Sequence, residues 1–236
     1  MWRSILKVMA ATALFGVAHS VLASRGAKKT AERLVGERWR NALYRPFYLA
    51  QSVATLSALA LYASRMQGRT LYRIRGPLAA LMRTGQAASL GYAVYAAREV
   101  GIARMLGLPG SLALLRGDVD VPPEPEAQGP ALNAYGKMGA TGPFALSRHP
   151  LNLAPLMVFW LEPEMTTRLA AFNCVATLYL ILGSAHEEMR LRAAYGNAYV
   201  EYQKSGVPFY VPSIYTKALS ASSGTLPDDH PTPFLE

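Results

Sequence analysis

The chain has 236 residues, of which 51% are hydrophobic and only 17% are charged, against about 25% charged in a typical soluble domain. The formal net charge is +9, but the bases stand in short segments beside apolar runs, which favours a membrane surface over nucleic acid as the partner. The single cysteine, Cys174, excludes an intrachain disulfide and a cysteine-based metal site, and its place in an apolar run predicts a small buried side chain.

The first apolar run, residues 5–23, predicts a membrane helix. Lys7 and His19 interrupt this run, and Lys7 lies near enough to one end for its ammonium group to reach the interface. The alternative is a cleaved signal peptide, because Val21-Leu22-Ala23 resembles a cleavage region. We favour a helix that is retained in the membrane.

A strongly basic segment separates this helix from the second predicted span, residues 42–64. Pro46 stands near the start of that span, where a helix tolerates proline. Within residues 24–45 only Glu32 and Glu37 are acidic, so the positive-inside rule places the segment in the cytoplasm. Its seven bases are Arg25, Lys28, Lys29, Arg33, Arg38, Arg40 and Arg45.

The third predicted span, residues 77–97, is weaker because it contains Arg83 and Gln86. Polar groups are expensive in a bilayer, so both side chains should face protein or a cavity. Residues 101–115 are too short and too broken to span, and they predict an interfacial helix. Residues 118–130 are rich in proline and acid, which predicts an extended loop.

Residues 151–161 and 169–185 are the last apolar runs, and Glu162-Pro163-Glu164 between them predicts a helical hairpin. The first of the two is short for a hydrocarbon core of ~30 Å. The predicted fold is therefore an all-α, polytopic integral membrane protein with about five transmembrane helices and a carboxy-terminal hairpin. Residues 1–215 form one domain, with its cofactor-binding part at 136–213, and residues 216–236 form a polar tail that we expect to be disordered.

Alternation of five spans places the amino terminus outside and residues 118–130, Arg148 and Glu187 inside. The acidic turn at Glu162 falls outside, as expected. One group of bases, on the outside in this topology, disagrees with the positive-inside rule. It consists of Arg65, Arg69, Arg73 and Arg75.

Arg148-His149-Pro150 is the first candidate for chemistry. Proline holds the preceding residue in extended geometry and is favourable at the first position of a helix. The free N–H groups at that helix start suit a carboxylate, and Arg148 adds a bidentate grip. The plainer interpretation is a positively charged anchor at the lipid interface.

Glu187-Glu188 is the second candidate, at the inner end of a long apolar helix. Adjacent residues point about 100° apart around a helix, so we expect at most one of the two acids to face a given pocket. The other would pair with Arg190 or Arg192. The plainer interpretation is a solvated helix end with local ion pairs, but beside Arg148 the acids suit a zwitterionic ligand such as S-adenosylmethionine.

The order and spacing of these motifs resemble the membrane methyltransferases that include isoprenylcysteine carboxyl methyltransferase and the phospholipid methyltransferases. The amino-terminal half is similar to a neighbouring branch, that of the methanethiol S-methyltransferases and denitrification-associated membrane proteins. Two positions depart from the family pattern, Asn152 and Ala154. The matching motifs are Gly142-Pro143-Phe144, Arg148-His149-Pro150, Glu187-Glu188, the run from Gly196 to Tyr202, and Val207-Pro208.

The resemblance implies S-adenosylmethionine-dependent methyl transfer at the membrane, with the site on the cytoplasmic face of a bacterial inner membrane. In this reading Arg148 holds the cofactor carboxylate, Glu187 or Glu188 holds its ammonium, and His149 orients the cofactor or contacts adenine. We assign no general base and expect no metal. The implied cofactor-binding residues are Arg148, His149, Pro150, Leu153, Glu187, Glu188, Tyr199 and Tyr202.

The acceptor implied by the resemblance is a lipid, another lipophilic compound or a small molecule with a thiol, carboxylate or amine. The residues that would line its path are Tyr44, Tyr48, Arg83 and Gln86, for which interhelical packing is the plainer interpretation. Two alternatives remain: a haem-binding isomerase or redox protein resembling zeta-carotene isomerase, with His19 and His149 as axial ligands, and a non-catalytic membrane factor.

Overall fold

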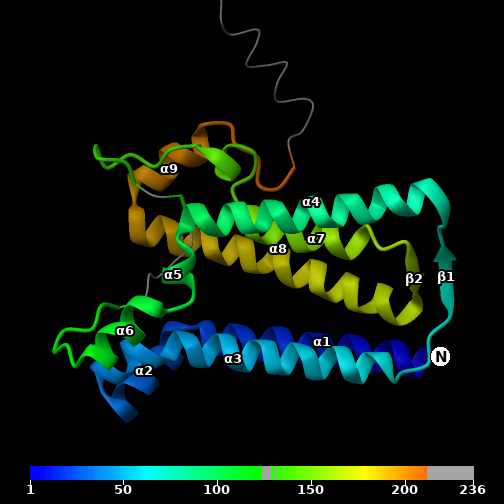
Figure 1. Cartoon of the computed structure of the whole chain (residues 1–236), viewed down its shortest axis with the longest axis horizontal. Helices are drawn as coiled ribbons and strands as arrows, with labels where there is room; N and C mark the ends of the chain where they lie inside the picture. Colours follow the sequence, from blue (N-terminus) through cyan, green and yellow to red (C-terminus); the bar gives the residue numbers. More distant parts are fainter. Residues whose placement is uncertain (124–128, 131, 212–236) are drawn as a thin grey trace, which may run out of the picture.

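The computed structural model describes residues 1–123, 129–130 and 132–211, so the predicted tail at 216–236 lies outside the described residues. Five helices run side by side in two layers (Figure 1), and α8 of one layer contacts α1 of the other. α1 and α3 form one layer, and α4, α7 and α8 form the other. Their bounds are α1 Trp2–Ala23, α3 Glu37–Ser64, α4 Gly76–Val100, α7 Pro150–Trp160 and α8 Thr167–Tyr195.

The shorter helices gather at one end of this bundle, on the left of Figure 1, and the amino terminus lies at the other end. The basic segment and the polar motifs therefore share one end of the molecule, as the topology requires. These short helices are α2 Arg25–Val35, α5 Ile102–Met105, α6 Leu108–Arg116, the 3₁₀ helix η1 Gly142–Ala145 and α9 Asn197–Lys204.

Among the described residues, α1, α3 and α8 are long and apolar enough to cross a membrane. α4 forms the predicted third helix and has 25 residues, but its composition falls short of that standard. α3 begins at Glu37 rather than at residue 42, so Pro46 lies inside the helix and not at its start. A proline is tolerated there because neighbouring groups in a membrane protein satisfy the freed carbonyl.

The chain is mostly helical, as predicted, but it also has a two-stranded antiparallel sheet, which we did not expect from the sequence and which closes the end opposite the polar motifs (Figure 1). β1 (Thr70–Arg73) pairs with β2 (Glu164–Thr166), with Arg73 opposite Glu164. These strands lie 90 residues apart in the chain. Sequence patterns of such short segments do not reveal a pairing of this kind.

The acidic turn pairs with two arginines at this end of the bundle. Arg73, one of the four bases that disagree with the positive-inside rule, forms an ion pair with Glu164. Arg83, which is not one of those four, binds Glu162 through both terminal nitrogens, at 2.8 and 3.0 Å. The turn therefore balances one of the four bases.

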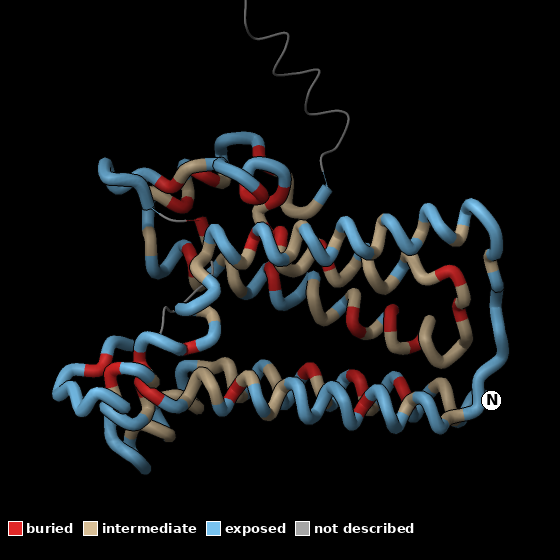
Figure 2. Tube along the Cα trace, in the orientation of Figure 1, coloured by how far each residue is buried: buried red, intermediate tan, exposed pale blue. Residues whose placement is uncertain are grey.

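Much of the surface of the helices is exposed (Figure 2). Large apolar side chains lie on it, as at Leu14 of α1, Val53 of α3 and Leu182 of α8. Cys174 is exposed as well, so the prediction of a buried cysteine is wrong. A bilayer-spanning helix is apolar on every side, and its hydrophobicity does not tell which side chains the protein covers.

α6 packs tightly against α3 through a glycine. A β-carbon added at Gly110 would stand 2.6 Å from the carbonyl oxygen of Asn41. One hydrogen bond belongs to the same contact, from Ser111 Oγ to the carbonyl of Ala42 at 2.8 Å, and Asn41 Nδ2 also donates to the carbonyl of Val121, in the segment after α6, at 2.9 Å. Only a residue without a side chain fits this contact.

We expect Gly110→Ala to lower the free energy of unfolding by about 1–3 kcal/mol, because backbone must move to admit the methyl group. Gly91→Ala is the matched control, since a β-carbon at that exposed position in α4 meets nothing within 4 Å. Alanine is the better helix former, so the control should gain about 0.5–1 kcal/mol. Thermal unfolding in detergent measures both, and equal changes would contradict the packing argument.

Candidate active site

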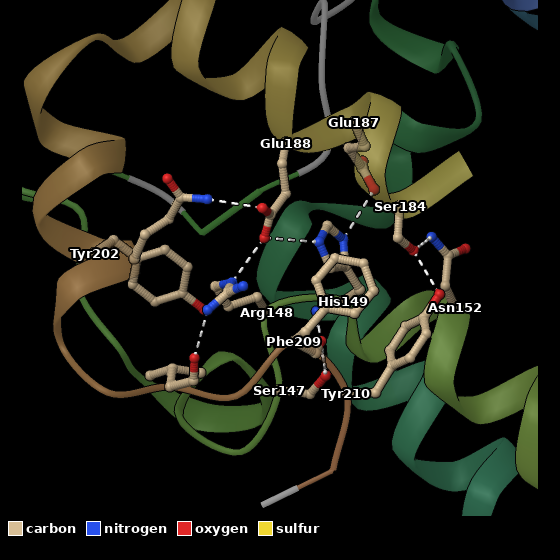
Figure 3. Close-up of polar contacts among 12 residues, drawn as sticks. Ser147, Arg148, His149, Asn152, Ser184, Glu187, Glu188, Tyr202, Phe209 and Tyr210 are labelled. Carbon is tan, nitrogen blue, oxygen red and sulfur yellow. Dashed lines mark hydrogen bonds and ion pairs between the residues drawn. The ribbon is translucent and has the colours of Figure 1, made fainter. Parts of the chain in front are cut away.

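The two polar motifs meet where α7 begins and α8 approaches its end (Figure 3). Arg148 Nε donates to Glu188 Oε1 at 2.7 Å, although the residues stand forty positions apart. The side chains of Arg148 and Glu188 are only 17% and 13% exposed. The packing of α7 against α8 therefore creates a largely buried ion pair.

The segment after α9 holds the turn before α7 in place. Ser147 Oγ donates to the carbonyl of Phe209 at 3.1 Å, and the backbone N–H of Arg148 donates to that of Pro208 at 2.9 Å. Arg148 Nη1 reaches the carbonyl of Val207 at 2.8 Å. The Val-Pro motif thus fixes the backbone and the guanidinium of the Arg-His-Pro motif together.

His149 lies at the centre of the site, with its side chain 1% exposed. Its Nδ1 is 3.3 Å from Glu187 Oε2, and its Nε2 is 3.3 Å from Glu188 Oε1. The ring of Phe209 packs against the imidazole at 4.7 Å between centroids. One imidazole therefore joins two carboxylates that are neighbours in sequence.

The prediction that at most one acid faces a given pocket is wrong, because the imidazole is wide enough to meet both carboxylates from its two nitrogens. We expected one of the two acids to pair with Arg190 or Arg192, but Glu188 pairs with Arg148. Arg192 donates instead to Gln203 Oε1 at 2.7 Å.

Gln203 is a site residue that sequence reasoning missed. Its Nε2 donates to Glu188 Oε2 at 2.8 Å, so the two oxygens of that carboxylate both have partners. Its position directly after Tyr202, on the helix that carries the Tyr motif, is the feature of the sequence that could have indicated it.

A second polar network lies beside the site (Figure 3). Ser184 Oγ accepts from Asn152 Nδ2 at 2.8 Å and lies 2.7 Å from Tyr210 Oη. Asn152 is one of the two departures from the family pattern, and in this chain its amide links α7 to α8. Sequence reasoning did not predict this link.

The helix start at Pro150 offers less of an anion cradle than we expected. The N–H groups of Asn152 and Leu153 both donate to the carbonyl of His149, at 3.1 and 2.9 Å. Pro150 is buried and has no N–H group to offer. Leu153 lies one turn into α7, so backbone amides contribute little to anion binding beside Arg148.

Tyr199 and Tyr202 are both buried in the core under the site, and burial raises the pKa of each phenol. Tyr202 Oη donates to the carbonyl of Phe144 at 2.7 Å. Tyr199 Oη is buried and has no hydrogen-bond partner among the residues that the structure describes. An unpartnered buried hydroxyl is rare and calls for an explanation.

We expect Tyr202→Phe to destabilise the fold by about 1–2 kcal/mol, since it leaves the carbonyl of Phe144 without its donor. Tyr199→Phe removes a hydroxyl that bonds to no described residue, so stability should stay constant or rise slightly. Chemical denaturation of the two variants in one detergent makes the comparison. Equal losses would show that Tyr199 Oη has a partner.

The structure does not bring the proposed acceptor residues to this site. Tyr44 donates to the carbonyl of Leu22 at 2.6 Å, which is a contact between α3 and α1. Gln86 donates to the carbonyl of Val158, eight residues beyond Pro150 and thus about 12 Å along α7. Arg83 binds Glu162 at the far end of the bundle.

The haem alternative gains no support from the two histidines. His19 Nε2 meets Tyr48 Oη and its Nδ1 lies 3.0 Å from Ser52 Oγ, while both nitrogens of His149 meet carboxylates. Each ring would have to give up a hydrogen bond to ligate iron. Within the described part of the chain, no three His, Cys, Asp or Glu side chains group as a metal site.

Comparison with known proteins confirms the expected resemblance. Over 71 residues the chain is 37% identical to the methanethiol S-methyltransferase of Pseudomonas deceptionensis, covering 30% of this chain and 27% of the relative. It is also 37% identical over 71 residues to that of Crocosphaera subtropica, covering 30% and 28%. Methanethiol S-methyltransferase 2 of Bradyrhizobium diazoefficiens is 34% identical over 74 residues, covering 31% and 28%.

The similarity spans little more than a quarter of the length of these relatives. No family model matches the chain, and no solved structure matches it. The likeness therefore supports a membrane methyltransferase of the isoprenylcysteine carboxyl methyltransferase type.

Proposed function

We propose that this chain is a membrane methyltransferase that uses S-adenosylmethionine and methylates a small thiol. The observation that carries the proposal is the convergence of Arg148, Glu187 and Glu188 on one buried imidazole. The partial similarity to bacterial methanethiol S-methyltransferases favours a small thiol over a lipid as the acceptor.

The charges of the site fit the donor. The side chains of Arg148, Glu187 and Glu188 bring one guanidinium and two carboxylates together. S-adenosylmethionine carries a carboxylate, an ammonium and a sulfonium. A site with groups of both signs suits such a ligand.

Arg148 is the residue that would hold the donor's carboxylate. Its Nε and Nη1 are engaged by Glu188 and Val207, while its Nη2 donates to no described residue. The ring of Phe209 covers the guanidinium, 5.7 Å from its central carbon. This cover keeps water from the charge and strengthens a grip on a carboxylate.

Glu187 is the residue that would hold the ammonium. Among the described residues its only hydrogen bond goes to His149, whereas Glu188 is already bound by Arg148, Gln203 and His149.

S-adenosylmethionine supplies, when bound, a methyl group on a positively charged sulfur. The protein's part is to position the donor and to exclude water, which is how methyl transfer from a sulfonium is accelerated. A thiolate acceptor needs no general base, so no side chain is assigned that role.

The membrane setting completes the proposal. α1, α3, α4 and α8 cross the membrane, and α7 with the extended residues 161–166 forms the other arm of a carboxy-terminal hairpin with α8. The basic residues of α2 lie at the site end of the bundle, which favours a cytoplasmic site in a bacterial inner membrane (Figure 1).

Incubation of the purified chain with isotopically labelled S-adenosylmethionine and separate acceptors tests this function. We expect label in the thioether formed from methanethiol and none in phospholipid or prenylcysteine. Labelled lipid would overturn the acceptor class. Saturable donor binding without any methylated acceptor would favour the non-catalytic factor, and a Soret band that His19→Ala removes would favour haem.

A further inference from the structure

An apolar groove of about 740 Å³ lies between α2 and the start of α3, away from the candidate active site. Leu34 and Trp39 line it and are exposed, Leu34 by 78% of its surface. Phe47 extends the lining along α3, and exposed Ala50 and Ala54 continue the same side of that membrane-spanning helix. The groove is therefore continuous with the surface that the bilayer covers.

α2 has the pattern of a helix that lies in a membrane interface. At 100° per residue, Ala31, Leu34 and Val35 fall on one side, and Lys29 and Arg33 fall on the other. Helices with an apolar face and a basic face bury the first in the hydrocarbon boundary and turn the second toward headgroups.

Bases outnumber acids in residues 24–45, and the acid of α2 is already paired. Arg40, which lines the groove, donates from Nη2 to Glu32 Oε2 at 2.8 Å, so the acid of α2 is neutralised. Arg40 Nε is buried and has no partner among the described residues. Residues 24–45 hold seven bases against two acids, which complements an anionic surface.

We propose that the α2–α3 groove holds an acyl chain of an anionic phospholipid, whose phosphate lies beside the basic face of α2. The apolar lining of the groove suits the acyl chain, and the surplus of bases favours anionic over zwitterionic lipid. Trp39 at the mouth of the groove is a residue type that favours this depth in a membrane. The inference rests on the membrane setting of the proposed function and not on methyl transfer.

Trp39 reports on the groove directly, because the chain has three tryptophans and two can be replaced. In a Trp2→Phe, Trp160→Phe background, we would titrate brominated phosphatidylglycerol or brominated phosphatidylcholine into the vesicles over the same range of mole fractions. We expect the anionic lipid to quench Trp39 fluorescence at several-fold lower mole fraction. Equal quenching by the two lipids would overturn the proposal.

Lys29→Gln and Arg33→Gln should each reduce the anionic preference about fivefold. The control carries the same change of charge at two exposed bases outside α2, Lys137→Gln and Lys204→Gln, and should keep the preference. A preference that survives the α2 changes would also overturn the proposal. Native mass spectrometry of the unsubstituted chain, with both lipids in competition, gives the comparison without any substitution, and no methyl donor is present in either assay.

Discussion

Replacing Arg148 by alanine should abolish measurable S-adenosylmethionine binding and lower the free energy of unfolding by about 3 kcal/mol. The reason is that Glu188, only 13% exposed, loses the guanidinium that compensates its charge. The carbonyl of Val207 loses a donor at the same time. Calorimetric titration of the donor and thermal unfolding in detergent measure the two effects.

A double variant separates these effects. Arg148→Met with Glu188→Met replaces both charges by apolar side chains of similar length, which is far less destabilising than leaving one charge unpaired. We expect most of the lost stability to return and donor binding to remain absent. Arg192→Ala, which removes an exposed base that bonds Gln203, is the control and should change stability by less than about 1 kcal/mol. If the donor affinity is unchanged in Arg148→Ala, Arg148 does not bind the donor's carboxylate.

Replacing Glu187 by glutamine should weaken donor binding about 10- to 100-fold while leaving the melting temperature nearly constant. A charge-assisted hydrogen bond to a ligand ammonium is worth about 1.5–3 kcal/mol, which is the source of the expected loss. Stability should hold because the glutamine oxygen can still accept from His149, the only described hydrogen-bond partner of Glu187.

Two further variants, at Glu188 and Glu201, test whether the effect is specific to Glu187. Glu188→Gln should lower the melting temperature as well as the affinity, because Glu188 pairs with Arg148 and Gln203. Glu201→Gln removes an exposed acid on α9 that pairs with Lys204 and should change neither. If Glu188→Gln alone weakens binding, the ammonium-binding role belongs to Glu188.

The main helices and the two polar motifs can be predicted from local sequence alone. Long apolar runs at 5–23 and 169–185 predict helices because a bilayer leaves the backbone few other ways to satisfy its hydrogen bonds. Arg148-His149-Pro150 and Glu187-Glu188 were recognisable because their residue types and order carry the signal locally. The resemblance they support agrees with the comparison to known methyltransferases.

Which of those groups contact one another depends on how the helices pack. The shared imidazole, the Arg148–Glu188 pair and the contribution of Gln203 depend on how α7, α8 and α9 pack, which no local pattern encodes. The pairing of β1 with β2 and the ion pair of Arg83 with Glu162 at the far end of the bundle also depend on tertiary packing. Period and composition fix what each segment becomes, whereas contacts between residues forty or more positions apart are fixed by the shapes of the surfaces that meet.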